Sequence, residues 1–197
     1  MSEDDESFSD LLARWEERWQ TKPPDAHELR AKHAERWVRF HSLPGSKRYP
    51  QDEAEYRVIL ERHNTVLDEL FTGQDVCVIT NGWSYPGDLA VRSDDQLRLH
   101  PGSELWTSSL TNEPDPEYRF FRHSYISRIQ WQPTCLDPLL RSVADDVSAG
   151  VIITDADLDQ LYHPYDGGAD VILANSTSRD AMRERHSDWL SKHPQGL

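Results

Sequence analysis

The sequence contains only two cysteines, Cys77 and Cys135, among its 197 residues. Two cysteines form neither a disulfide framework nor the paired Cys-x-x-Cys spacing of a zinc site, and they favour a reducing compartment. No apolar run approaches the roughly 18 residues that a membrane span needs. The acidic start MSEDDESFSD has no apolar core, so it does not resemble a signal peptide. These absences predict a cytoplasmic protein.

Catalytic signatures are also missing. Neither G-x-S-x-G nor H-E-x-x-H occurs, and Gly45-Ser46-Lys47 lacks the rest of a phosphate-binding loop. His33, His63 and His186 lie at helical spacing among apolar residues, where core histidines are more frequent than ligands. His186 and His193 have no third metal partner in the sequence. We therefore expect no cofactor and no metal site.

The chain has few cations. Lys and Arg number 21 against 35 Asp and Glu, which gives a net charge of −14. This excess argues against nucleic acid and anionic membranes as partners, because phosphate groups are bound by cationic side chains. Residues 27–48 are the exception, with six Lys or Arg against two Glu, whereas residues 135–175 hold eight Asp and one Arg. The sequence therefore predicts one basic patch.

The basic patch is expected to contain Arg36, Arg39, Lys47 and Arg48. On a helix, Arg36 and Arg39 would be surface neighbours, and the following loop would bring the other two back toward them. We expect Arg39 to pair with a carboxylate of the chain itself and Lys47 and Arg48 to be exposed. The alternative is a free site for an anion or an acidic partner.

Hydrophobic periodicity predicts helices in the first third of the chain. Residues 1–22 are expected to be an acidic tail followed by an amphipathic helix, and residues 23–197 a single α+β domain. Asp25 and Glu28 have capping-box spacing, and the apolar stripe after them predicts a second helix that continues through Trp37 to Phe40 or His41. A third helix is predicted from about Asp52 to Phe71.

Strand patterns dominate the remainder. Predicted strands cover Val76–Thr80, Leu105–Leu110, Tyr118–Trp131, with a bulge or bend in the last, and Val151–Thr154. Residues 81–88 are predicted to form a turn with an exposed aromatic side chain. A helix capped by Asp137 is expected to end at Gly150. The order predicts a largely antiparallel sheet covered by helices on one face, with N-terminal helices, strands, then helix–hairpin–helix. One parallel pair, between the third and fourth strands, is permitted.

The hairpin is predicted from turn chemistry between two apolar runs. Pro164-Tyr165-Asp166-Gly167-Gly168 separates Leu161-Tyr162-His163 from a strand that begins near Ala169. Gly167 and Gly168 are expected at the bend, with at least one at positive φ. The closing helix has Met182, His186, Trp189 and Leu190 at helical spacing and is expected to end at Pro194.

Two segments carry a family resemblance. The first is Trp37-Val38-Arg39-Phe40, then Lys47-Arg48, then a long helix that ends at Leu70-Phe71. The second is residues 161–171 followed by a helix that ends at Trp189-Leu190. Together they resemble a bacterial family of uncharacterised proteins, a domain of unknown function with a Tyr-Asp turn and a closing Trp helix. The sequence departs from that family at Gly167, where its members often have a basic residue. The resemblance implies no activity.

Four carboxylates have the spacing of a calcium loop. Asp155, Asp157 and Asp159 alternate, and Asp166 stands at the twelfth position. Gln160 replaces the turn glycine, however, Asp replaces the closing Glu, and strands are expected to flank the segment. The same residues with His163 could instead form a catalytic acid/base pair. We expect the third reading, in which the carboxylates are polar edges of a hairpin.

These observations favour a non-enzymatic bacterial cytoplasmic protein that binds a protein partner, in an immunity or toxin-neutralising role. The alternative is a small hydrolase or metal-binding enzyme that uses the Asp/His cluster of residues 155–166. An enzyme should have those side chains in one pocket, whereas a binding protein should have an exposed aromatic patch rimmed by acidic residues. The candidate binding residues are Arg39, Lys47, Arg48, Trp83, Tyr85 and Tyr165.

Overall fold

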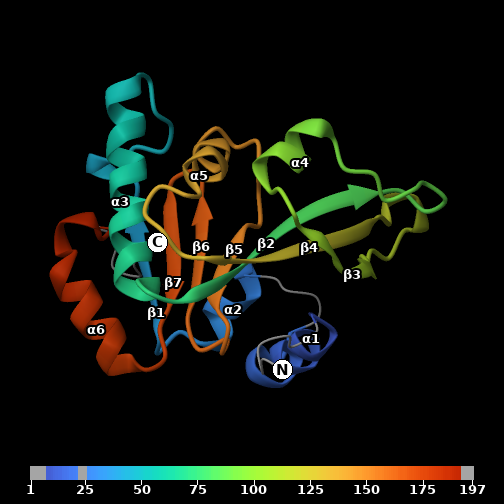
Figure 1. The fold of residues 1–197 in the computed structure, drawn as a ribbon, viewed down its shortest axis with the longest axis horizontal. Coiled ribbons are helices and arrows are strands. Elements are labelled where there is room, and N and C mark those ends of the chain that lie inside the picture. The colour runs from blue at the N-terminus through green and yellow to red at the C-terminus, as the bar shows by residue number, and fades with distance from the viewer. Residues whose placement is uncertain (1–7, 22–25, 192–197) are drawn as a thin grey trace.

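Seven strands form one sheet in the computed structural model, which describes residues 8–21 and 26–191 (Figure 1). The strand order is β1-β7-β6-β5-β2-β4-β3, and every neighbouring pair is antiparallel. The strands are β1 (Trp37–His41), β2 (Asp75–Ser84), β3 (Glu104–Leu110), β4 (Phe121–Gln130), β5 (Ile152–Asp155), β6 (Leu161–Tyr165) and β7 (Gly168–Ile172). The predicted α+β class is confirmed. The permitted parallel pair is wrong, because β5 pairs with β2 and runs antiparallel to it.

Helices cover both faces of the sheet, whereas the sequence analysis expected them on one. The helices are α1 (Phe8–Trp19), α2 (Ala26–Lys32), α3 (Glu53–Phe71), α4 (Asp94–Leu99), α5 (Asp137–Ala144) and α6 (Ser176–Arg185). Helices α3, α5 and α6 pack on one face, and α1 and α2 pack on the other (Figure 1). Short 3₁₀ turns span Pro44–Ser46, Pro116–Tyr118 and Ser187–Trp189. None of the helices within residues 8–21 and 26–191 is both long and apolar enough to cross a membrane.

Strand β2 shows why both faces need cover. Val76 and Val78 belong to the core under α3, α5 and α6, while Cys77 and Ile79 belong to the core under α1 and α2. Successive side chains of a strand point to opposite faces, so an unbroken apolar run requires a core on each side. The two tryptophans of α1, Trp15 and Trp19, are fully buried in the second core.

The segment after α2 is a strand and not a continuation of the helix. Helix α2 ends at Lys32, and β1 begins at Trp37 with burial that alternates along Trp37–His41. Val38 and Phe40 enter the core, and all five residues pair with β7. The predicted second helix is therefore wrong beyond Lys32, and Arg36 and Arg39 are not neighbours on a helix.

The β6–β7 hairpin is confirmed, but its glycines serve a different purpose from the predicted one. Neither Gly167 nor Gly168 has positive φ. A Cβ on Gly168 would lie 2.0 Å from the carbonyl oxygen of Phe40, because β1 passes close to the hairpin end. Gly168 is thus required by close approach of two backbones and not by a left-handed conformation.

The outer half of β2, together with β4, β3 and α4, forms an arm that extends away from α3 and α6 (Figure 1). Residues 81–84 continue β2 as strand, so the predicted turn begins only after Ser84. The irregularity expected within Tyr118–Trp131 lies instead in β3, between Leu105 and Thr107. Tyr118 belongs to a 3₁₀ turn before β4.

Two further helix ends differ from expectation. The N-cap of α5 is Leu136, with Asp137 already in the first turn, and the helix ends at Ala144, so that residues 145–150 form a loop. Helix α6 ends at Arg185 and is followed by a 3₁₀ turn. The predicted end at Pro194 lies outside the described residues, as do His193 and residues 1–7.

Candidate functional site

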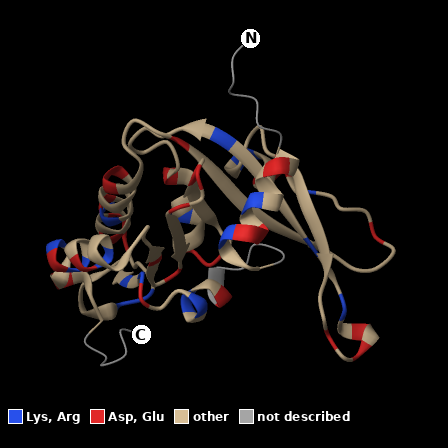
Figure 2. Cartoon of the chain, turned by 90° about the horizontal axis from the view of Figure 1, so that it is seen from below, with Lys and Arg blue, Asp and Glu red and all other residues tan. Residues whose placement is uncertain are grey.

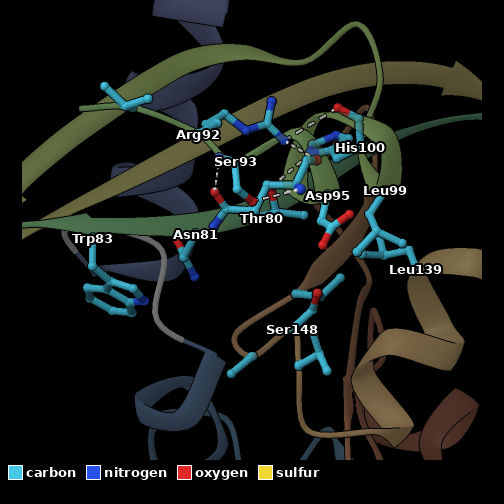
Figure 3. A pocket seen from close by; sticks show the side chains of 15 residues that line it. Thr80, Asn81, Trp83, Arg92, Ser93, Asp95, Leu99, His100, Leu139 and Ser148 are labelled. Carbon is cyan, nitrogen blue, oxygen red and sulfur yellow. Dashed lines mark hydrogen bonds between the residues drawn. The ribbon is translucent and has the colours of Figure 1, made fainter. Parts of the chain in front are cut away.

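A pocket of about 470 Å³ lies where α4, the middle of β2 and the loop between α5 and β5 meet (Figure 3). Thr80, Asn81 and Trp83 line it from β2, and Ser148 lines it from the loop. The amide of Asn81 donates to the carbonyl of Gly150 at 3.0 Å, which fixes the loop to β2. The pocket is therefore built from three segments that are held together by hydrogen bonds.

Helix α4 is a short wall held by its own cap. The Ser93 hydroxyl accepts the Gln96 backbone N–H at 3.2 Å, and the Gln96 side chain accepts the Ser93 N–H at 2.9 Å. This reciprocal capping box fixes the first turn of a six-residue helix. The cap directs the carboxylate of Asp95 toward the pocket, as Figure 3 shows.

His100 joins the end of α4 to the sheet. Its Nδ1 lies 2.8 Å from the Thr80 hydroxyl, and its Nε2 lies 2.8 Å from the Ser127 hydroxyl. Burial, and secondarily the charge of Arg92, lowers the pKa of His100 to about 4. The ring is therefore neutral at pH 7 and can donate at one nitrogen and accept at the other. Its two hydrogen bonds to hydroxyl groups of the sheet hold the end of α4 in place, so His100 positions this wall of the pocket.

The cation at the pocket, Arg92, is directed away from it. Its guanidinium donates to the Ser103 hydroxyl at 2.5 Å and to the Gln96 carbonyl at 2.8 Å, and it lies 4.5 Å from the centre of the Tyr125 ring. Burial lowers the pKa of Arg92. The carboxylate of Asp95 also lines the pocket, and it forms an ion pair with Arg98 at 2.6 Å (Figure 3).

A second hollow, also of about 470 Å³, adjoins the first on the outer side of Trp83. Its apolar walls are Trp83, Tyr85, Leu89 and Phe120, and Asp88 lies at its margin. The Trp83 indole packs edge-on against the Phe120 ring with centroids 5.1 Å apart, yet 54% of Trp83 remains exposed. We call the two hollows with their shared indole the Trp83 groove.

Exposed apolar side chains concentrate at this groove. Ten large hydrophobic side chains of the described residues are exposed, and half of them line one of the two hollows. Those five are Trp83, Tyr85, Leu89, Val91 and Val147. Isolated exposed apolar residues are common on soluble proteins, but their concentration at a concave surface makes the groove the candidate site. The predicted candidates Trp83 and Tyr85 are thus brought together.

The other predicted binding residues lie elsewhere. Arg39 on β1 donates two hydrogen bonds to Asp170 on β7, from Nε at 2.7 Å and from a terminal nitrogen at 2.8 Å. Burial opposes the charge of Arg39, but the hydrogen bonds and charge of Asp170 outweigh it and raise the pKa of Arg39. The Tyr165 ring lies 4.8 Å from the guanidinium, and burial raises the pKa of Tyr165 to about 12. The predicted internal pairing of Arg39 is confirmed.

Lys47 and Arg48 also have carboxylate partners. The Lys47 ammonium contacts both oxygens of Glu55, at 2.5 and 2.6 Å, and Arg48 donates to Asp166 at 2.5 Å. The side chain of Arg48 is 63% exposed and that of Lys47 is 33% exposed. Arg48 is therefore exposed as predicted and Lys47 is only partly so. Together with Arg39, they are paired cations and not a free basic patch.

Of the four carboxylates with calcium-loop spacing, Asp155, Asp157 and Asp159 lie near one another, and Asp166 is separated from them. Asp155 is buried, and one of its oxygens accepts the backbone N–H groups of Asp159 and Gln160 at 2.8 and 3.2 Å. Burial raises the pKa of Asp155, and those two hydrogen bonds oppose the rise. Asp157 and Asp159 point toward α1 and form ion pairs with it.

Asp166 lies at the opposite end of β6 from Asp155. An extended strand of five residues spans roughly 13–16 Å, which no single metal ion bridges. His163 lies between them on β6, with Nδ1 2.7 Å from the carbonyl oxygen of Val151. Within residues 8–21 and 26–191, no group of three or more His, Cys, Asp or Glu side chains is arranged to hold a metal. Neither the calcium loop nor the acid/base pair is assembled.

The family model described as "Domain of unknown function (DUF3885)" matches residues 26–194. The chain belongs to the DUF3885 family. The match includes the whole sheet, helices α2–α6 and both hollows, while α1 lies before it. The predicted resemblance to a family of unknown function is confirmed at that level. Comparisons with curated proteins and with solved structures gave no match.

In this DUF3885 chain, sequence reasoning found the aromatic part of the groove and missed its α4 wall. The missed residues are Val91, Ser93, Asp95, His100 and Val147. One signal was available, because Ser93-Asp94-Asp95-Gln96 matches the capping-box pattern that starts a helix. No local pattern indicated Val147, which reaches the groove only because the loop after α5 is tied to β2.

Proposed function

We propose that this protein acts in the bacterial cytoplasm by binding a basic protein partner through the Trp83 groove. The observation that carries the proposal is the concentration of exposed apolar side chains at a concave surface that holds an inward-facing carboxylate. In its specific form, the proposal is that the partner is a toxin domain and that binding neutralises it.

The groove has the composition of a protein-binding surface. Binding energy at interfaces concentrates in a few aromatic residues, Trp and Tyr above all, that pack into desolvated pockets. Trp83 and Tyr85 are both more than half exposed, and Trp83 is held by Phe120, so its position is fixed before a partner arrives. Preorganisation of this kind lowers the entropy lost on binding.

Charge argues for a basic partner. The chain carries −14, and Asp88 and Asp95, the latter paired with Arg98, line the two hollows. Figure 2 shows Asp and Glu residues on the outer loops of the arm. A net charge of this size accelerates association with a cationic protein and opposes association with an acidic one.

The alternative, a hydrolase or metal-binding enzyme built on residues 155–166, draws no support from the geometry. Its side chains lie at opposite ends of β6 and point into separate contacts. In the Trp83 groove, His100 has two hydroxyl partners rather than the carboxylate that orients a catalytic imidazole. A binding role needs none of these groups.

The proposal is tested by comparing partner capture between matched variants. The double variant Trp83→Ala/Tyr85→Ala removes the aromatic part of the groove, and Leu97→Ala removes an exposed side chain of α4 that lines neither hollow. After crosslinking in the source cells, proteins captured by wild type and by Leu97→Ala but lost with the double variant are candidates. The purified candidate should bind wild type more weakly as salt rises, and its toxicity should be relieved by co-expression of wild type or Leu97→Ala but not of the double variant. Equal capture by both variants would refute the groove as the site.

A further inference from the structure

Strand β3 forms one edge of the sheet, and among residues 8–21 and 26–191 no strand pairs with its outer side. The opposite edge, β1, is continued by a bridge from Phe40 to Leu190. Helix α1 reaches β3 only from the face of the sheet, where the Trp106 indole donates to the carbonyl of Phe8 at 2.7 Å. The described residues thus cover one edge and leave the other accessible.

The regular part of the β3 edge, after its register shift, carries neither a charged residue nor a proline. Proteins commonly place Lys, Pro or inward-pointing charges on an edge strand to block the addition of another strand. Residues 105–110 are Leu-Trp-Thr-Ser-Ser-Leu, without charge or proline. The register shift between Leu105 and Thr107 disturbs one end, so the regular edge is residues 107–110.

Register identifies which backbone groups point outward. The N–H of Thr111 donates to the carbonyl of Phe120 at 2.9 Å, so that position faces β4. Antiparallel pairs alternate between hydrogen-bonded and non-hydrogen-bonded residues, and therefore Ser109 and Thr107 also face β4. The N–H and C=O groups of Ser108 and Leu110 face away from β4.

The surroundings of this edge select the charge of its occupant. Glu104 begins β3, and Glu113, Asp115 and Glu117 follow it. These four carboxylates outnumber two nearby arginines: Arg119, whose guanidinium donates to backbone carbonyls of the same loop, and Arg122, which is in register with Ser109. A second copy of the chain would bring another −14 to this edge. Like charges therefore disfavour self-pairing, and a segment rich in Lys and Arg is complementary.

The end of β3 lies near one wall of the apolar hollow. Leu110 is paired with Phe121, and the preceding residue, Phe120, is part of that hollow. A strand added along residues 107–110 lies beyond β3, with β3 and β4 between it and Trp83 on β2, so only a segment that continues past Leu110 toward Phe120 also reaches the hollow. Strand addition of this kind combines backbone hydrogen bonds for affinity with pockets for specificity.

We propose that the partner supplies an extended basic segment that adds to β3 as an eighth strand, with backbone hydrogen bonds to Ser108 and Leu110. This inference rests on the proposed function and adds to it the conformation and charge of the bound segment.

The test uses two substitutions at one position. Leu110→Pro removes the outward N–H without removing a bond to β4, and proline is tolerated at such edge positions. Leu110→Ala keeps the N–H and removes most of the side chain, so it controls for the loss of leucine. Thermal melts of both variants establish that each is folded.

The probe is a blocked peptide of alternating Lys and Val, about ten residues long, which is the upper length of a common strand. Its affinity is measured by titration at low salt, and amide exchange is followed by NMR. We expect protection of the Ser108 and Leu110 amides, weakening by at least about tenfold with Leu110→Pro, and less than about threefold change with Leu110→Ala. A peptide N-methylated at alternate residues, and one with Glu in place of Lys, should bind far more weakly.

The outcomes separate this inference from the proposed function. Absence of binding, binding without protection of those two amides, or equal affinity of Leu110→Pro and Leu110→Ala would overturn strand addition. In each case the Trp83→Ala/Tyr85→Ala experiment would still decide whether the groove binds a protein.

Discussion

Arg39→Glu is the substitution whose effect on stability the structure specifies best. Asp170 is 5% exposed, and it accepts two hydrogen bonds from Arg39 and a third, at 2.9 Å, from the Trp37 indole. Glutamate at position 39 removes two of the three donors and places a second negative charge beside a buried carboxylate. The expected result is a large loss in the free energy of unfolding.

The magnitude follows from the burial of both partners. The side chains of Arg39 and Asp170 are 16% and 7% exposed, so solvent screens the pair weakly. Breaking a buried ion pair by removing one partner costs about 3–5 kcal/mol. Because the Trp37 indole still donates to Asp170, we expect the lower end, about 3 kcal/mol. For a protein of this length that corresponds to a fall in melting temperature of roughly 6–12 °C.

Urea unfolding and thermal melts of four proteins test this reasoning. Besides wild type and Arg39→Glu, they are Arg39→Met, which keeps an unbranched apolar stem, and Arg39→Met/Asp170→Asn, which removes the uncompensated charge. The double variant should be more stable than Arg39→Met, because the penalty comes from the unpaired carboxylate. A melt of Arg39→Glu that matches wild type would refute the argument, as would a double variant no more stable than the single one.

Three further predictions follow from the fold. Gly168→Ala should lower the free energy of unfolding by about 2–3 kcal/mol in urea unfolding, because its Cβ would lie 2.0 Å from the β1 backbone. A Cβ on Gly167 would meet the Tyr165 side chain at 3.1 Å, so Gly167→Ala should cost less. The free energy of unfolding should fall as pH drops from 6.5 toward 4, by about 3 kcal/mol from His63 alone. Burial lowers the folded pKa of His63 to about 4, so the unfolded chain binds the proton first. His63→Gln should reduce this dependence of stability on pH. Millimolar calcium should leave the melting temperature unchanged, and a rise that Asp157→Ala abolishes would contradict the separated carboxylates.

Local pattern predicted the elements whose burial is determined by the chain nearby. Helix α3 and the β6–β7 hairpin have strong periodicity and turn chemistry, and both occur as predicted. The segment Trp37–His41 satisfies helical spacing with Leu29 and also alternates with period two, so periodicity alone left two readings. Its pairing with β7, about 130 residues later in the chain, decides for the strand. A contact between residues so far apart in the sequence cannot be predicted from a short stretch of sequence.

Asn81-Gly82 shows a different cause of error. Asn-Gly is a strong turn signal, yet Gly82 lies within β2, where the Tyr125 ring passes 3.2 Å from the position of its missing Cβ. Glycine in a strand often marks such a close approach. Asn81 likewise makes a long-range contact, since its side-chain Oδ1 accepts the Ser124 hydroxyl at 2.9 Å. The groove could be predicted only in its exposed aromatics, because its wall depends on these contacts between distant segments.

The cations near the β6–β7 hairpin and those of the arm have different kinds of partner. Arg39, Lys47 and Arg48 pair with carboxylates around the β6–β7 hairpin and α3, on the side of the sheet opposite the arm in strand order. At the arm, Arg92 and Arg119 donate to hydroxyl and carbonyl oxygens, whereas Arg98 forms an exposed ion pair with Asp95. The Asp95 carboxylate at the groove is therefore partly neutralised, as are the carboxylates near the hairpin. The expected attraction for a cationic partner consequently rests on the total charge of −14 and not on an unpaired carboxylate at the groove.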